Sequence, residues 1–479
     1  MNKDIPSADS DSTKKLETNS SSDFVTPGLI LFVDTFLIAL CAWLYWLVIS
    51  KLTLASEIGL AITVYSFVIL VTTLTQLGIE FPLLKKSHVQ GTSILGTSLM
   101  IELVLTLVSI PFVFIVFNTF YVESVKQFTW ISITLLMLLA MNYVLRFSLL
   151  GISNSKIVLV IDLIGLAIKL PTGFLLVSQS FGALGILISI LLEALFVAAA
   201  SLYFTKKLFK FRLGDKEYFK ETIIDALINT PAKWSKMIIL ILSVVLLALM
   251  HISASDVGIF YVALMITVFV SSFASSMAYM VIPSSFSLNK DLSSSSLRIS
   301  LSLTAPIVVV LLLVPGPILS LIGPEYESAV AVLLILTISI IPSAITTNMI
   351  SKLNNLAQSR MLIFSGAVQI ATFFILFYVL VPKYGTIGCA ISILAAYIIS
   401  SVLLTSLTDR RSFRYIASAC TAVLVGFIGG YVVGLITSYG QELLIVLSSI
   451  AVSMIVIFAT KNMTIDETKF LLKAMLHRK

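Results

Sequence analysis

Four ionisable residues lie inside long apolar stretches of the first half of the sequence: Glu102, Asp162, Lys169 and Glu193. A charge at the centre of a bilayer costs roughly 2.5–3.5 kcal/mol on insertion scales, so each of these groups is a candidate for function. Asp162 comes two helical turns before Lys169, on the same helix face. Lys169 can offer a cation to a phosphate, and the carboxylates can exchange protons. The alternative is an ion pair between Lys169 and Glu102 or Glu193 that joins neighbouring helices.

A second set of polar side chains lies near residue 230. Asn229, Lys233 and Lys236 are spaced i, i+4 and i+7, so they form a stripe on one face of a helix. Two ammonium groups there suit the phosphate of an amphipathic ligand. Thr230-Pro231 favours another interpretation, because this pair is typical of a helix start. A span that begins there would let both lysines reach the lipid headgroups instead.

The elements that carry these charges are predicted to be membrane-spanning helices. The chain has 479 residues, of which 58% are hydrophobic and only 11% are charged, whereas a soluble protein has about 25% charged residues. This composition predicts an all-α polytopic membrane protein. The formal net charge of +7 therefore does not indicate nucleic-acid binding. Three cysteines and three histidines are scattered, and their spacing predicts no metal or catalytic cluster.

Fourteen apolar stretches are long enough to cross a bilayer, for which a helix needs about 20 residues. Residues 1–26 precede them and have the polar composition of a disordered cytoplasmic tail. The first six spans cover about 28–49, 58–80, 91–117, 128–150, 157–177 and 182–204. The next six cover about 224–250, 256–282, 297–322, 327–350, 359–381 and 385–407. A last pair covers about 413–438 and 441–460, before a tail at 461–479.

Two short segments recur along the chain at almost the same distance. Ala55–Leu60 (ASEIGL) returns as Ala254–Ile259 (ASDVGI), 199 residues later. Gly182–Leu191 returns as Gly385–Leu394, 203 residues later. Similarity between two apolar segments is common by chance, but two matches at one spacing predict an internal repeat of about 200 residues.

The repeat divides the chain into two homologous lobes of six helices each. Because six is an even number, the lobes share one orientation and are parallel repeats. At the repeat distance Asp34 corresponds to Lys233, so equivalent helices of the two lobes carry opposite charges. The predicted domains are an N-lobe at 27–204, a basic cytoplasmic linker at 205–222, a C-lobe at 223–408 and an extra helix pair at 409–460.

The basic residues predict how the chain is oriented. Most of the 31 Lys and Arg residues fall in the two tails and in every second loop, whereas the intervening loops hold only Lys51, Lys126 and Lys383. Cytoplasmic loops carry the excess of basic residues. Both termini are therefore predicted to be cytoplasmic, and the predicted location is the cell (cytoplasmic) membrane.

Aromatic residues gather near the predicted outer end of the first span, where Trp43, Tyr45 and Trp46 follow one another closely. This pattern is typical of the aromatic belt at a membrane interface. Stacking on a sugar ring is the alternative interpretation.

Three segments in register with these spans carry a family resemblance: Glu57-Ile58-Gly59-Leu60, Asp256–Tyr261 and Val381–Gly388. Together with fourteen spans they resemble the polysaccharide-transporter, or oligosaccharide flippase, branch of the multidrug/oligosaccharidyl-lipid/polysaccharide exporter superfamily. The resemblance covers residues 28–460. It implies two six-helix lobes around a V-shaped cavity, plus two extra C-terminal helices. It also implies that a lipid-linked oligosaccharide or polysaccharide repeat unit moves to the outer leaflet by alternating access.

The resemblance implies roles for the charged residues. The expected substrate is a glycan linked to polyprenyl phosphate or pyrophosphate, and the expected partners are membrane lipids and a glycan polymerase or ligase. Substrate binding is expected at Lys169, Lys233, Lys236 and Asn229, and coupling or gating at Asp34, Glu102, Asp162 and Glu193.

Other functional classes remain as alternatives. An ion-coupled multidrug or cation exporter of the same superfamily would use Asp34 or Asp162 as its coupling carboxylate, and coupling to H⁺ or Na⁺ is left open. A non-transporting scaffold would not require the deep charges. An enzyme is not expected, because the predicted outer loops are short and lack an Asp-x-Asp motif, and the chain has no Gly-x-x-x-x-Gly-Lys-Ser/Thr loop. No cofactor is expected.

Overall fold

The computed structural model describes residues 36–119, 123–152, 154–208, 212–214, 216–288, 293–355, 358–436, 442–460 and 462–463. Within these ranges the regular structure is helical throughout, which confirms the predicted all-α class. Eleven helices there are long and apolar enough to cross a membrane, and Phe36–Ser50 and Ile239–Leu249 are shorter apolar helical segments. The count of fourteen spans stays a prediction, because the beginning of the first span lies outside the described residues.

The helices of the N-terminal half follow the predicted spans closely. After Phe36–Ser50 come α2 (Ala55–Thr75), α3 (Glu80–Thr119), the short α4 (Glu123–Lys126), α5 (Thr129–Gly151), α6 (Ser155–Ser178) and α7 (Gly182–Leu208). The C-terminal half contains α8 (Lys216–Leu249), α9 (Ala254–Leu288), α10 (Ser293–Leu313), α11 (Pro315–Ser320), η1 (Pro324–Ala329), α12 (Val330–Asn355), α13 (Ser359–Thr408), α14 (Ser412–Ile436) and α15 (Glu442–Ala459).

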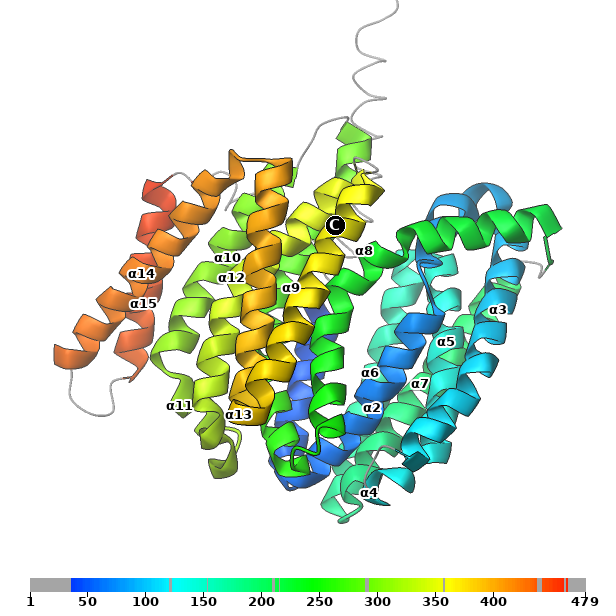
Figure 1. Cartoon of the computed structure of the whole chain (residues 1–479), viewed down its shortest axis with the longest axis horizontal. Helices are drawn as coiled ribbons and strands as arrows, with labels where there is room; N and C mark the ends of the chain where they lie inside the picture. The colour runs from blue at the N-terminus through cyan, green and yellow to red at the C-terminus, as the bar shows by residue number, and fades with distance from the viewer. Residues whose placement is uncertain are drawn as a thin grey trace, which may run out of the picture.

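The long helix α13 contains two of the predicted spans. Its 50 residues would extend about 75 Å if straight, more than twice the hydrocarbon thickness of roughly 30 Å. The chain reverses instead at Gly385, whose φ of 53° and ψ of −130° are not helical. Figure 1 shows α13 as a hairpin that turns at the lower end of the bundle.

The glycines of the second recurring segment have matching conformations in the two halves. Gly182, at the start of α7, has a φ of 49°, and its counterpart Gly385 has a φ of 53°. Three residues later, a Cβ on Gly388 would lie 2.6 Å from the carbonyl oxygen of Leu380, and one on Gly185 would lie 3.0 Å from the Cβ of Leu176. The first glycine of each pair makes the turn and the second allows close packing, so the same local geometry supports the predicted repeat.

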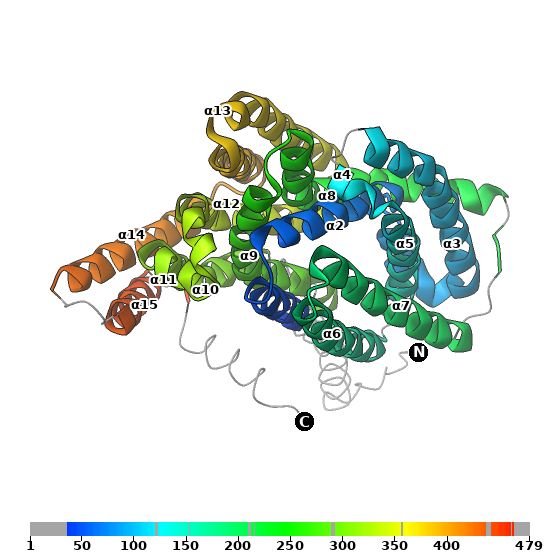
Figure 2. The ribbon, with the colours of Figure 1, turned by 90° about the horizontal axis from the view of Figure 1, so that it is seen from below.

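The helices form two groups with α8 between them. Figure 1 shows α3, α5, α6 and α7 on one side and α10, α12 and α13 on the other, with α14 and α15 at the far edge. The helix α8 packs against α2 and α3 of the first group and against α13 of the second. Seen from below, α2 lies along α8 and α9, where the two groups meet (Figure 2). The extra pair α14 and α15 packs on α10.

The alternative interpretation of Thr230-Pro231 as a helix start does not hold, because α8 is already helical from Lys216 and continues to Leu249. The Thr230 hydroxyl donates a hydrogen bond to the carbonyl oxygen of Ala226 one turn earlier, at 3.0 Å, rather than capping a new helix. Figure 1 shows the first part of α8 lying across the upper end of the N-terminal group before the helix turns downwards.

The basic linker is attached to the N-terminal group. Tyr218, Phe219 and Ile223 of α8 pack on a buried cluster that α3 and α5 supply, whereas Lys216 and Lys220 are exposed.

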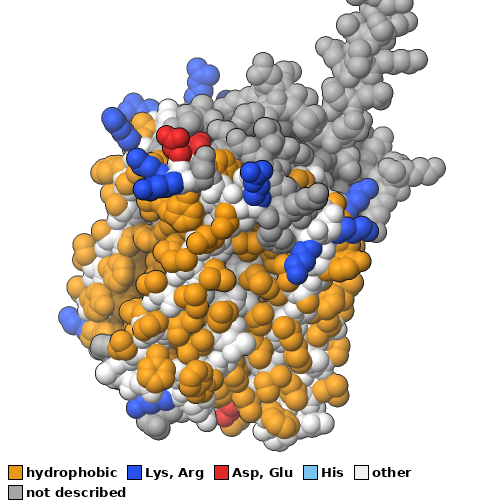
Figure 3. Space-filling model, turned by 90° about the vertical axis from the view of Figure 1, so that its right-hand side faces the viewer, with side chains coloured by type: hydrophobic (Ala, Val, Ile, Leu, Met, Phe, Trp, Pro, Cys, Tyr) orange, Lys and Arg blue, Asp and Glu red, His pale blue; other side chains and the backbone are white. Residues whose placement is uncertain are grey.

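Charged and apolar side chains occupy different levels along the axis of the bundle. On the face seen in Figure 3, Lys and Arg gather along the upper edge and hydrophobic side chains cover the middle.

We predict that Gly385→Ala destabilises the protein by about 1–3 kcal/mol, because the new side chain would be held in a backbone region that only glycine adopts readily. Nothing lies within 4 Å of the new Cβ, so strain and not a clash is the expected cause. The melting temperature of the purified protein in detergent measures the effect. Gly316→Ala is the control, because its Cβ also meets open space and its backbone is helical. Equal melting temperatures for the two variants would contradict the prediction.

Candidate functional site

Lys169 and Glu193 form an ion pair inside the N-terminal group. The Nζ atom of Lys169 on α6 lies 2.9 Å from Oε2 of Glu193 on α7. Lys169 is buried, with 8% of its surface exposed, and its ammonium group lies 4.8 Å from the centre of the Tyr45 ring. The alternative predicted from the sequence, an ion pair with Glu193, is therefore present. A buried cation that has both a carboxylate and an aromatic face as partners is compensated electrostatically.

Tyr45 extends this arrangement into a polar cluster that joins three helices. Its hydroxyl group lies 2.7 Å from the Ser189 hydroxyl group on α7, and Ser189 donates to the Ile186 carbonyl oxygen at 2.8 Å. Gly173 on α6 makes room for the ring, because a Cβ there would lie 2.8 Å from it. A small cavity of about 350 Å³ lies beside the cluster, lined by Cys41, Tyr45, Lys169 and apolar residues of α6.

The predicted aromatic belt on the first span is wrong for two of its three residues. Tyr45 and Trp46 are only 1% and 5% exposed, and the Trp46 ring packs edge-on against Tyr261 of α9, with 5.0 Å between ring centres. The third residue, Trp43, stacks on Phe269 of α9. Composition could not distinguish a lipid-facing aromatic residue from one facing the other half of the protein, because both surroundings are apolar.

The other deep charges of the N-terminal group occupy separate sites. Asp162 on α6 pairs with Arg146 on α5, with 2.8 Å between Oδ2 and a guanidinium nitrogen. Glu102 on α3 is 2% exposed and accepts a hydrogen bond from the Thr75 hydroxyl group of α2 at 3.1 Å. The structure thus distributes Lys169, Asp162 and Glu102 over three contacts between different helices. The predicted alternative partner for Lys169, Glu102, makes this contact with α2.

Four predicted site residues cannot be placed. Asp34 lies outside the described residues, and the side chains of Asn229, Lys233 and Lys236 are not described either, although their backbone belongs to α8. Their roles stay predictions from the sequence.

The first recurring segment forms the contact between the two groups at the lower end of the bundle. A Cβ built on Gly59 of α2 would overlap the Ala254 carbonyl oxygen of α9, and one built on Gly258 would overlap the Ala55 carbonyl oxygen. Each of these Cβ positions also lies 3.0 Å from the backbone nitrogen of the other glycine. The two copies of the repeat therefore pack backbone to backbone, and Ile58 and Val257 beside the glycines are 0% and 1% exposed.

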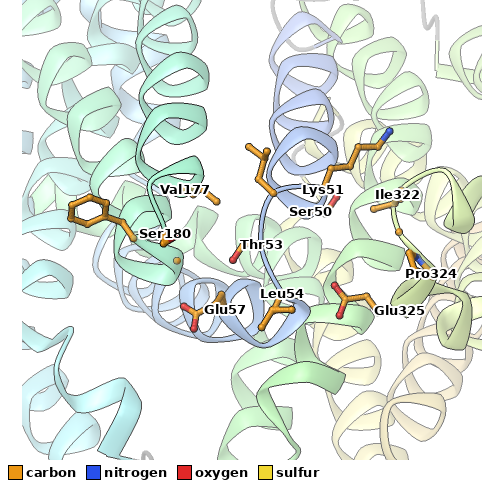
Figure 4. Close-up of a pocket in the computed structure, with 14 residues that line it drawn as sticks. Ser50, Lys51, Thr53, Leu54, Glu57, Val177, Ser180, Ile322, Pro324 and Glu325 are labelled. Carbon is orange, nitrogen blue, oxygen red and sulfur yellow. The ribbon is translucent and has the colours of Figure 1, made fainter.

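Two carboxylates bind helix N-termini next to this contact. Glu57 accepts a hydrogen bond from the backbone N–H of Ala183 at the start of α7, at 2.7 Å. Glu325 of η1 accepts one from the N–H of Ala55 at the start of α2, at 3.1 Å, so it joins the two groups. Both use the positive end of a helix dipole. Figure 4 shows the two carboxylates on either side of Leu54, within the lining of a cavity of about 890 Å³.

Sequence reasoning missed a polar network at the upper end of the C-terminal group. Lys352 of α12 donates to Asp409 at 2.9 Å, and Ser294 donates to the same carboxylate at 3.3 Å. Burial alone would raise the pKa of Asp409, but the hydrogen bond and charge of Lys352, with bonds from Arg411 and Ser412, outweigh it and lower the pKa. The sequence predicts a solvent-exposed loop position for Lys352, because this residue stands at the end of a span. No sequence signal identifies Asp409 as its partner.

We predict that removing Glu193 destabilises the protein by on the order of 3 kcal/mol, because the buried Lys169 is left unpaired, and that removing Lys169 costs less, because Glu193 is only half-buried. Lys169→Met and Glu193→Gln should each lower the melting temperature in detergent, and the double variant should be more stable than either. Additive losses in this double-mutant cycle would show that the two side chains do not interact.

We also predict that Gly59→Leu separates the lower ends of α2 and α9. The separation is measured on purified protein in which Cys41 and Cys420 are replaced by serine. A cysteine introduced at Ile58 reports it through the rate of its reaction with a charged maleimide. Ile58→Cys should react slowly alone and at least tenfold faster with Gly59→Leu. Gly316→Leu is the matched control, since its side chain meets open space. Unchanged labelling with Gly59→Leu would contradict the close contact, and the buried Cys389 reports general unfolding.

No protein-family model and no curated protein sequence matches the chain. Solved structures do. The lipid II flippase MurJ in an inward closed conformation superposes with a TM-score of 0.70 and 14% identity, over 94% of this chain and all of that chain. An inward-facing multidrug resistance MATE family transporter of the MOP superfamily superposes with a TM-score of 0.61 and 14% identity, over 81% of this chain and 98% of that one. A mutant of the Vibrio cholerae MATE transporter VcmN superposes with a TM-score of 0.58 and 14% identity, over 83% of this chain and 98% of that one.

These likenesses confirm the predicted resemblance at the level of the fold: the chain has the architecture of the MurJ and MATE transporters of the MOP superfamily.

Proposed function

We propose that the protein is a flippase that carries a lipid-linked oligosaccharide or polysaccharide repeat unit across the membrane. The observation that supports this most is the extent of the likeness to the lipid II flippase, which includes 94% of this chain and the whole of that structure. The two MATE transporters compared above extend over 81% and 83% of this chain. A substrate with a long lipid tail also suits a protein that carries an extra helix pair, α14 and α15, beside its two groups.

The contact between α2 and α9 supports an alternating-access mechanism. In this conformation the Gly59–Gly258 contact closes the lower end of the interface, so a substrate would enter from the opposite end. Lys and Arg gather at that upper end on the face seen in Figure 3, which by the positive-inside rule is the cytoplasmic side. Release to the outer leaflet would then require the two groups to separate at α2 and α9.

The phosphate of the lipid carrier would bind to cations in the N-terminal group and on α8. Lys233 and Lys236 are the first candidates, with Asn229 on the same helix face. Lys169 could bind the phosphate only after its present ion pair is broken, because its ammonium group lies 2.9 Å from the Glu193 carboxylate. A phosphate would have to displace that carboxylate, or a proton would have to neutralise it. This exchange would make Glu193 the coupling group and Lys169 the phosphate ligand, with no ion other than H⁺ required.

An ion-coupled multidrug exporter is the second candidate function. It is favoured by the MATE structures among the neighbours and by the carboxylates of Glu102, which is buried, and Asp162, which is half-buried. Its substrate would be an organic cation, for which the buried ammonium group of Lys169 is an unfavourable neighbour. The two functions therefore differ in the sign of the charge that the site must accept.

We predict that a strain lacking the gene loses surface glycan and accumulates the lipid-linked precursor inside the cell. The wild-type gene should restore display, whereas Lys233→Ala and Lys236→Ala should each lower it at least tenfold. Lys169→Ala combined with Glu193→Gln tests the buried pair without leaving a lone charge. Surface glycan and inner-leaflet precursor are both quantified, and membrane levels of each variant are matched by immunoblot.

Two controls make the result specific. Lys383→Ala removes an exposed lysine beside the turn at Gly385, away from the cavity at Glu57 and Glu325, and should restore display fully. Sensitivity of the deletion strain to cationic drugs is measured in the same cells. Normal glycan and normal precursor levels together with heightened drug sensitivity would favour the exporter over the flippase.

A further inference from the structure

A cavity of about 550 Å³ lies where α10, α14 and α15 meet, away from the contact between the two groups. Its lining includes Arg298 of α10, Arg414 and Ser418 of α14, and Thr460 and Asn462, which follow α15. α10 begins at Ser293, α14 begins at Ser412 and α15 ends at Ala459, so these termini lie at one end of the bundle. In the orientation proposed above, this is the level of the inner lipid headgroups.

The polar floor of the cavity is fixed by contacts between the two extra helices. The Ser418 hydroxyl group donates to the Thr460 hydroxyl group at 2.6 Å, and the Asn462 side-chain amide donates to the Tyr415 carbonyl oxygen at 3.3 Å. Asn462 is 2% exposed, and Met463 beside it is 3% exposed and packs with Ile457 in a buried cluster. One wall of the cavity, at Asn462 and Met463, is therefore anchored in packed helices, whereas Arg414 and Thr460 are exposed.

The charge of the lining has one sign. Among the described residues that line the cavity, Arg298 and Arg414 are the ionisable members apart from the Tyr415 phenol, and none is a carboxylate. Asp409, three residues before α14 begins, is engaged with Lys352 at 2.9 Å. Guanidinium groups bind phosphate oxygens through paired N–H donors, and neighbouring hydroxyl groups complete such sites. Basic pockets between membrane helices on the cytoplasmic side are typical sites for phospholipid headgroups.

Exposed apolar side chains occur along α14 and α15 from the end at the cavity towards the opposite end of the pair, which suits a lipid tail. Leu424 and Ile428 of α14 are 62% and 58% exposed, and Leu443 and Ile455 of α15 are 71% and 66% exposed. In a membrane these faces lie against hydrocarbon. A molecule whose phosphate occupies the cavity could therefore extend its chains along α14 and α15 without burying a polar group.

We propose that this cavity is a binding site for the phosphate of an anionic lipid, held by Arg298 and Arg414 at the end of the α14–α15 pair. Two sources supply that chemistry, an anionic phospholipid of the membrane and a polyprenyl phosphate. The proposal does not depend on the transport function, because it concerns only the ligand that these helices bind.

The experiment measures lipid binding to the full chain purified in a neutral detergent, as the rise in melting temperature during titration with each lipid. The probes are phosphatidylglycerol, undecaprenyl phosphate and the zwitterionic phosphatidylcholine. Arg414→Gln is the test variant. Arg411→Gln is the matched control, since it removes the same charge three residues away from an exposed position that does not line the cavity.

At least one anionic lipid should stabilise the wild type and Arg411→Gln equally, with an apparent affinity at least tenfold lower for Arg414→Gln. A larger effect of phosphatidylglycerol identifies a membrane phospholipid, and a larger effect of undecaprenyl phosphate identifies a carrier lipid. Equal affinities for Arg414→Gln and Arg411→Gln would overturn the proposal, and so would equal stabilisation by phosphatidylcholine. Native mass spectrometry of the same samples counts bound lipids, which keeps the test valid if a variant melts at a different temperature before any lipid is added.

Discussion

The contact that the rest of the structure depends on is the crossing of α2 and α9, where two backbones meet with no side chain between them. At Gly59 and Gly258 each helix approaches the carbonyl oxygen of the other so closely that a single methyl group would not fit. Ile58 and Val257 are buried on either side. Because the same short sequence supplies both helices, the contact has an approximate twofold symmetry. Packing of this kind is dominated by van der Waals forces between small residues, as is usual for helices in lipid.

Charges stabilise each group of helices internally. The pairs Lys169–Glu193 and Arg146–Asp162 join neighbouring helices of the N-terminal group, and Lys352–Asp409 joins elements of the C-terminal group. A buried ion pair resists separation because each partner alone would be left uncompensated in an apolar medium. Such pairs hold neighbouring elements of each group together.

Much of this arrangement could be predicted from the sequence, although some of the pairing could not. Apolar length and the positions of charged loops located most of the helices, although α3 begins at Glu80 and α8 at Lys216, well before the predicted spans at 91 and 224. The recurring segments predicted a repeat, but not that its two copies touch at Gly59 and Gly258. Lys169 had two carboxylates at about its own depth, and only the rotation of α6 against α7 selects Glu193. Helix rotation is set by packing with neighbours, which hydropathy does not encode.

The two incorrect interpretations of the sequence, at Tyr45 and Trp46 and at Thr230-Pro231, both arise from tertiary packing that local sequence patterns do not encode. Tyr45 and Trp46 were assigned to the membrane interface, yet they pack inward against α7 and α9, because lipid and protein interior are equally apolar surroundings for an aromatic ring. Thr230-Pro231 was interpreted as a helix start, although the preceding turns of α8 are already held by the packing of Phe219 and Ile223 on the N-terminal group. Tertiary packing of an amphipathic face outweighs a local capping signal when enough apolar area is buried.

In the mechanism proposed above, the two groups would separate at α2 and α9, where the closest contact is between the backbones at Gly59 and Gly258. The hydrogen bond from the Ala55 N–H to Glu325 is replaced by water at both ends when the groups separate, so its net contribution is about 1 kcal/mol. The glycine contact loses only dispersion energy, which lipid or substrate can restore in part. Glu57 and Ala183 both belong to the N-terminal group, so the proposed movement would leave the cap at the start of α7 intact. The proposed rocking movement would therefore break the contact at α2 and α9 while leaving the ion pairs inside each group in place.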